Sequence, residues 1–153
     1  MSLALLAAAL LAPAVPAETP RAFLARIYAP YERGQPNVFA HPERLFAPPL
    51  VRAMREDSRL SNGEVGVLDY DPLCQCQEAG GIRPKVRELL VSGPSAVAFV
   101  TISWPGGTDR RDLILRLART AAGWRIADVS TKEEPSLLAT LVRENAARSR
   151  TRR

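Results

Sequence analysis

Two cysteines, Cys74 and Cys76, lie two positions apart in the stretch of the chain that is richest in chemically capable side chains. Such a pair could act as a redox couple, bind a soft metal such as monovalent copper, or form a disulfide. We favour the disulfide, because two thiolates supply only about half of the ligands that a structural zinc ion needs. A ring this short removes little entropy from the unfolded chain, so its effect would be on local shape.

Acidic and amide side chains flank the two cysteines. If Pro72 begins a turn, the Asp71 carboxylate is expected to cap that turn. Alternatively, Asp69 and Asp71 could form an oxygen-rich calcium site with Gln77 and Glu78, but the spacing of these residues is not that of an EF-hand loop. The capping role is the simpler interpretation, and we expect neither a bound metal nor a cofactor.

No familiar catalytic motif accompanies this stretch. His41 is the only histidine, and its place in a loop before a proline predicts a surface position. We therefore expect a non-enzymatic domain that binds a small ligand or an envelope protein. The alternative is a pocket enzyme with Asp71 or Asp128 as general base, since an apolar pocket raises the pKa of a carboxyl group toward neutrality. The expected binding residues are Asp69, Tyr70, Asp71, Gln77, Glu78, Trp104 and Asp128.

Length and charge restrict the class of protein. The chain has 153 residues, of which 46% are hydrophobic, and this suits a single globular domain. Its net charge is +5, but most of the arginines are scattered, so we expect no nucleic-acid partner. Residues 148–153 form the one basic cluster, which we expect to be a flexible tail with at most weak contact to anionic lipid.

The N-terminus predicts export. Residues 3–11 form an uncharged apolar run that is too short to span a bilayer, and small residues follow it at 15–17. We expect a signal peptide over residues 1–17, cleaved after Ala17, and a single domain over residues 18–147. The mature protein would be periplasmic or secreted, where an oxidising environment permits the disulfide.

Helical periodicity marks three segments. Thr19 and Pro20 predict the start of the first helix, whose apolar face should end or bend near Ala29 because Pro30 interrupts the backbone hydrogen bonds. The second helix should start within residues 46–49 and end at a turn at residues 61–63, with Asp57 among the charged residues of its outer side. The apolar face predicted for a final helix comprises Leu137, Leu138, Leu141 and Val142.

Alternating hydrophobicity predicts strands over residues 84–91, 95–104, 110–119 and 124–130. The turns between them are short, and such turns join antiparallel strands. The sequence therefore predicts an α+β domain in which N-terminal helices pack on a curved antiparallel sheet of about four strands, followed by a short C-terminal helix.

Two motifs suggest a family. Asp69-x-Asp71-Pro72-x-Cys74-x-Cys76-Gln77, followed by the strand at residues 124–129 with the pattern Trp-Arg-Ile-x-Asp-Val, resembles a family of exported bacterial proteins known only as a domain of unknown function. That resemblance implies an NTF2-like, or cystatin-like, cone-shaped fold. A curved sheet wrapped around helices often leaves an apolar pocket at its open end. It implies no established activity. One departure is Ala127, where a second acid would be expected.

Overall fold

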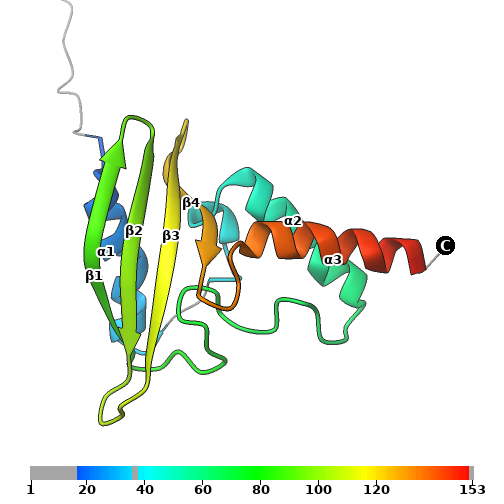
Figure 1. The fold of residues 1–153 in the computed structure, drawn as a ribbon, viewed down its shortest axis with the longest axis horizontal. Helices are drawn as coiled ribbons and strands as arrows, with labels where there is room; N and C mark the ends of the chain where they lie inside the picture. Colours follow the sequence, from blue (N-terminus) through cyan, green and yellow to red (C-terminus); the bar gives the residue numbers. More distant parts are fainter. Residues whose placement is uncertain (1–16, 36–37, 152–153) are drawn as a thin grey trace, which may run out of the picture.

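The computed structural model describes residues 17–35 and 38–151 (Figure 1). The elements follow in the order α1 (Pro20–Glu32), the 3-10 turn η1 (Pro42–Arg44), α2 (Pro48–Ser61), β1 (Arg83–Ser92), β2 (Ser95–Ser103), β3 (Arg110–Thr120), β4 (Gly123–Ser130) and α3 (Leu137–Thr151). This order confirms the predicted α+β class. The predicted signal peptide lies outside the described residues except for Ala17, and none of the described helices is long and apolar enough to cross a membrane.

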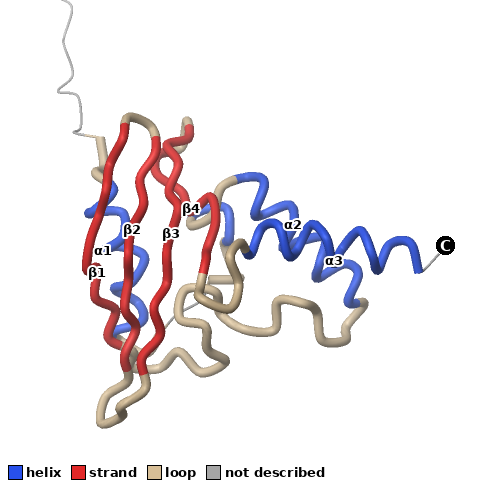
Figure 2. Tube along the Cα trace, viewed as in Figure 1, coloured by secondary structure: helices blue, strands red, loops and turns tan. Residues whose placement is uncertain are grey.

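The four strands form one antiparallel sheet in the order β1-β2-β3-β4. The predicted alternation is observed, because Leu113, Leu115 and Leu117 of β3 are all buried. Leu115 pairs with Ala98 of β2, which is also buried, so the two strands present a continuous apolar face. Helix α1 lies across this face behind β1 and β2, whereas α2 and α3 pack against β4 and against each other (Figures 1 and 2).

The sequence predicted that helix α1 ends or bends near Ala29, and the helix continues to Glu32. The Thr19 hydroxyl caps the helix by accepting a hydrogen bond from the Ala22 N–H at 3.1 Å, as expected. Pro30 lies inside the helix, which ends at Glu32 rather than near Ala29. Pro30 costs the helix one backbone hydrogen bond, because it has no N–H to donate to the Arg26 carbonyl, and the Tyr31 ring that follows it is buried in the core.

Asp57 of α2 is buried, which corrects the prediction that it lies on the outer side of the helix. Its carboxylate accepts hydrogen bonds from the backbone N–H groups of Val67 and Leu68, at 3.0 and 3.1 Å. The guanidinium of Arg148 in α3 forms an ion pair with the same carboxylate. A side chain at Gly66 would not fit here, because its Cβ would lie 2.7 Å from the Ser61 hydroxyl oxygen.

Helix α3 differs from the prediction in two ways. Val142 was assigned to the apolar face, but it is 56% exposed, and the buried face instead carries Asn145, whose side-chain amide donates to the Ala53 carbonyl of α2 at 2.9 Å. The helix also runs through Arg148 to Thr151, where a flexible tail was predicted. The ion pair to Asp57 explains this difference, because it holds the last turns of α3 against α2.

We expect Asp57→Ala to destabilise the protein by about 3–5 kcal/mol, because it leaves Arg148 and two backbone N–H groups without their partner. Equilibrium unfolding in urea measures this change. Arg59→Ala is the matched control, since Arg59 forms an exposed ion pair with Glu56 and its loss should cost no more than about 1 kcal/mol. Equal costs for the two variants would contradict the role given to Asp57.

Candidate functional site

The stretch at residues 71–76 closes on itself within the long connection from α2 to β1. Cys74 and Cys76 form the predicted disulfide, with their Cα atoms 5.2 Å apart. The Asp71 N–H donates to the Cys76 carbonyl at 2.8 Å, and the Gln75 N–H donates back to the Asp71 carbonyl at 2.8 Å. Gln75 adopts a left-handed conformation, with φ of 55°. These bonds make the segment a compact unit, which we call the disulfide loop.

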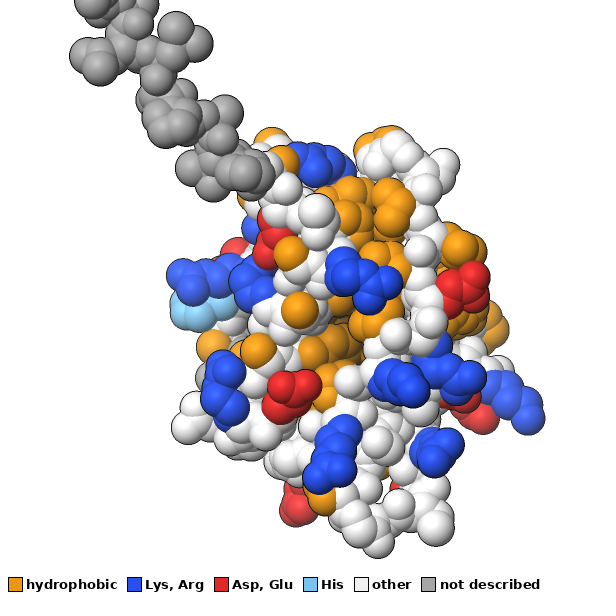
Figure 3. Space-filling model, turned by 90° about the vertical axis from the view of Figure 1, so that its left-hand side faces the viewer, with side chains coloured by type: hydrophobic (Ala, Val, Ile, Leu, Met, Phe, Trp, Pro, Cys, Tyr) orange, Lys and Arg blue, Asp and Glu red, His pale blue; other side chains and the backbone are white. Residues whose placement is uncertain are grey.

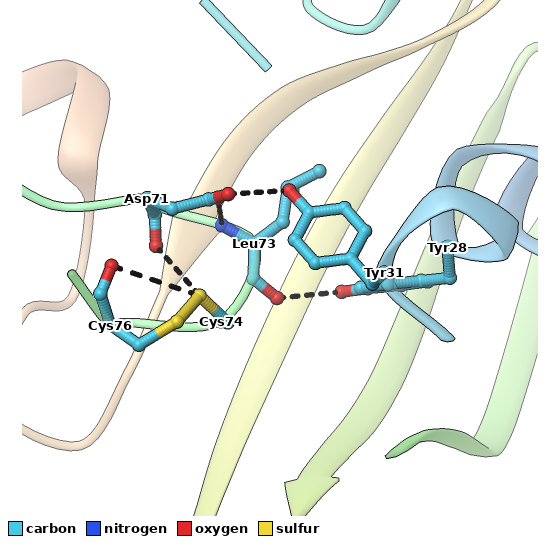
Figure 4. Close-up of a disulfide and its surroundings, with 6 residues drawn as sticks. All are labelled: Tyr28, Tyr31, Asp71, Leu73, Cys74 and Cys76. Carbon is cyan, nitrogen blue, oxygen red and sulfur yellow. Dashed lines mark hydrogen bonds between the residues drawn. A yellow bond between two sulfur atoms is a disulfide. The ribbon is translucent and has the colours of Figure 1, made fainter. Parts of the chain in front are cut away.

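Two tyrosines of α1 fasten the disulfide loop to the core (Figure 4). The Tyr31 hydroxyl donates to the Oδ2 atom of Asp71 at 2.7 Å, and the Tyr28 hydroxyl donates to the Leu73 carbonyl at 3.1 Å. The Oδ1 atom of Asp71 accepts from the Leu73 N–H at 2.8 Å. Asp71 therefore caps the turn at Pro72 as predicted, and it also accepts a hydrogen bond from a residue 40 positions away.

Burial controls the electrostatics of this group. Desolvation raises the pKa of the Asp71 carboxyl above its ordinary value of 3.8, although the hydrogen bonds from Tyr31 and from the Leu73 N–H act in the opposite direction. Burial, followed by the nearby Asp71 charge, also raises the pKa of both Tyr28 and Tyr31. The two hydroxyls therefore stay protonated at physiological pH and remain hydrogen-bond donors to the loop.

A shallow hollow lies on the surface beside the disulfide loop. Its volume is about 230 Å³, and its lining residues are Val38, Phe39, Asp69, Tyr70, Asp71, Gln77 and Ala79. Four of the binding residues expected from the sequence are thus brought together. Tyr70 is held in place because its hydroxyl donates to the Glu134 carboxylate at 2.7 Å. Asp69 and Gln77 are exposed and present polar groups to solvent.

The other expected binding residues lie outside this hollow. Glu78 follows Gln77 in the sequence and is exposed. Trp104 follows β2 and packs near the Arg111 guanidinium, whose carbon lies 5.9 Å from the ring centroid. Asp128 organises the start of α3, because its carboxylate accepts hydrogen bonds from the Ser136 hydroxyl at 2.6 Å and from the Leu138 N–H at 3.0 Å. His41 is exposed, as predicted.

Phe39 is a surface residue of this site that the sequence analysis did not identify. Its side chain is 53% exposed. It lines the hollow beside the disulfide loop and also a second hollow of about 440 Å³, which extends to Glu64 and Gly66. Asp69 is shared by the two hollows in the same way. Phe39 lies in an irregular segment without periodicity, so no pattern indicated which way its ring would point.

The connection that carries these residues is acidic, although the chain as a whole is basic. Residues 60–82 contain no lysine or arginine. The acids of this segment are Glu64, Asp69, Asp71 and Glu78. Of these acids, Glu64 and Asp69 are exposed and line the hollows beside Phe39. Against a net charge of +5, they make the surface around Phe39 attractive to a cationic group.

Comparison with known proteins identifies a similar fold. The chain matches no protein-family model and no curated protein. It is similar in structure to a chain in the crystal structure of the type VI native effector-immunity complex Tae3-Tai3 from Ralstonia pickettii, with a TM-score of 0.53. Sequence identity is 22%, and the alignment covers 74% of this chain and 95% of that chain. The family suggested by the sequence motifs, with its NTF2-like fold, remains a prediction.

The raised pKa of Asp71 predicts a pH-dependent stability. The protein gains stability from a neutral Asp71 below the ordinary pKa of 3.8, and it loses this contribution as the pH rises through the higher pKa of the folded state. Asp71→Asn cannot ionise, so the free energy of unfolding of this variant minus that of wild type should increase with pH across this window. Urea unfolding at matched pH values measures it; a constant or falling difference would contradict the raised pKa.

Proposed function

We propose that this chain is an exported, non-enzymatic domain that binds a protein partner in the bacterial envelope. The proposed recognition surface consists of the exposed Phe39 ring and the polar groups of Asp69, Tyr70 and Gln77. The observation that carries the proposal is that the disulfide loop is fixed before any partner arrives, by the disulfide and by the hydrogen bonds of Tyr28 and Tyr31. A rigid surface loses less conformational entropy on binding.

The form of this surface favours a protein over a small molecule. The hollow beside the disulfide loop measures about 230 Å³, less than the roughly 300–1,000 Å³ of pockets that enclose drug-sized ligands. The second hollow, of about 440 Å³, has the volume of such a pocket but is open to solvent and does not enclose a ligand. An exposed aromatic ring between two hollows is instead the arrangement expected for a protein-interface anchor. The acidic surroundings of Phe39 indicate that the partner presents a basic surface, since complementary charge steers association.

The structural similarity supports a role in protein binding. The similar chain belongs to an effector-immunity complex of a type VI system, in which two proteins bind each other. We infer a comparable role, in which this chain holds a partner protein in a stoichiometric complex. The disulfide supports export, because such bonds persist in oxidising compartments.

The alternative of a pocket enzyme has weaker support. Both carboxylates considered as general base are engaged in hydrogen bonds that organise the fold. Asp71 accepts from Tyr31 and from the Leu73 N–H, and Asp128 accepts from Ser136 and Leu138. A general base needs a free lone pair directed at its substrate, so these bonds favour a structural role for both acids.

Site-specific photocrosslinking in the native host tests the proposal. We expect p-benzoylphenylalanine at position 39 or 77 to give a discrete protein adduct in the envelope fraction. The same group at Arg52, which is exposed on α2, serves as the control and should not give this adduct. Adding Asp69→Lys should reduce the adduct yield several-fold, because it reverses a charge that faces both hollows, while circular dichroism shows an intact fold.

Two outcomes would contradict the proposed function. Adducts that are the same at positions 39, 77 and 52 would show that this surface has no specific protein partner. Recovery of the precursor, with residues 1–17 still attached and located in the cytoplasm, would contradict export. Mass spectrometry of the purified protein and cell fractionation give the second result independently of the first.

A further inference from the structure

The two edges of the sheet are protected differently. At the β4 edge, the segment just before α2 forms a short parallel pairing with β4. The Ala47 N–H donates to the Ile126 carbonyl, and the Ile126 N–H donates to the Leu45 carbonyl, both at 2.8 Å. At the opposite edge, β1 pairs with β2 and with no other strand of the described chain. The outer edge of β1 therefore has backbone groups available for a further strand.

Exposed apolar side chains accompany this open edge. Leu90 is 53% exposed and Val91 is 55% exposed, and both lie near the end of β1. Viewed from this side, the surface shows a vertical band of hydrophobic side chains with lysine and arginine side chains beside it (Figure 3). The bulge between Val86 and Glu88 distorts the middle of β1, but the segment from Leu89 to Ser92 pairs regularly with β2.

Charge distinguishes the beginning of β1 from its end. Arg83, Lys85 and Arg87 are exposed, and Glu88 is the single acid of the strand. The edge thus combines a cationic half with an apolar half. Charged residues on an edge strand usually discourage indiscriminate pairing, but the same cations attract a strand of opposite charge.

We propose that the open edge of β1 binds an extended segment of a partner protein that is both acidic and apolar, as an additional antiparallel or parallel strand. Backbone hydrogen bonds to β1 supply affinity, and side chains supply selectivity: apolar groups against Leu90 and Val91, carboxylates against Arg83, Lys85 and Arg87. This inference goes beyond the proposed function, because it uses a different surface and does not require the one around Phe39.

An acidic segment fits this edge better than a second copy of the chain. Each copy brings three cations and one acid on β1 and a net charge of +5, so self-pairing joins surfaces of like charge. An acidic segment instead neutralises the excess charge. Strong dependence of binding on salt is therefore expected, since such contacts are screened as ionic strength rises.

Two short capped peptides test the inference with the full chain. One alternates valine with glutamate, and the other alternates valine with lysine. Binding is followed by NMR hydrogen exchange of the isotopically labelled protein. The glutamate peptide should slow the exchange of β1 amides that do not pair with β2 by at least about tenfold near saturation, and the lysine peptide should not, because its charge repels β1.

A charge-reversed variant tests whether the cations of β1, rather than the net charge of the protein, determine which peptide binds. The double variant Lys85→Glu with Arg87→Glu should prefer the lysine peptide, because both side chains are exposed and their reversal leaves the core unchanged. The matched control, Arg52→Glu with Arg150→Glu, changes the net charge equally on α2 and α3 and should still prefer the glutamate peptide. The two double variants have the same net charge, so the same peptide preference in both would show that net charge decides binding and would overturn a role for β1.

Three other outcomes would overturn the inference. Protection of amides outside β1 would place the binding site elsewhere, and a lack of protection at the highest soluble peptide concentration would show that the edge does not accept a strand. A dimer in sedimentation equilibrium that Leu90→Lys dissociates would show that a second copy occupies the edge. None of these results bears on crosslinking at positions 39 and 77, so the two proposals fail independently.

Discussion

The buried carboxylate of Asp71 is the constraint that fixes the loop connecting the helices to the sheet. It is held by hydrogen bonds from the Tyr31 hydroxyl and the Leu73 N–H. A hydrogen bond to a charged group contributes about 1.5–3 kcal/mol, and a buried group left without one costs a comparable amount. Helix α1 therefore does more than cover the sheet, since its tyrosines determine where the disulfide loop lies.

Asp57 likewise fixes the beginning of the connection from α2 to β1. Its carboxylate accepts the Val67 and Leu68 N–H groups and is neutralised by Arg148. Long irregular connections in small domains are uncommon, and those that persist usually serve binding. Here two buried acids satisfy the backbone, which leaves Asp69 and Gln77 exposed on an ordered support. The same connection thus carries the buried hydrogen bonds on its inner side and the proposed recognition surface on its outer side.

The sheet was predictable because its signal is local: alternation placed Leu113, Leu115 and Leu117 inward, and short turns required antiparallel pairing. The cap at Asp71 was also predictable from the proline that follows it. The link from Tyr31 to Asp71 joins residues 40 positions apart, and no local pattern encodes it. Asp57 could have been placed correctly, since it is seven residues after Leu50 and therefore lies on the same helical face.

Amide hydrogen exchange of the free protein tests whether the disulfide loop is ordered before any partner binds. The N–H groups of Asp71, Leu73 and Gln75 all donate within the loop. They should exchange as slowly as the paired amides at the centre of β2 and β3, and Tyr31→Phe should accelerate them selectively. Exchange at the rate of an unstructured chain, unchanged by Tyr31→Phe, would contradict the account of a loop fixed by Asp71.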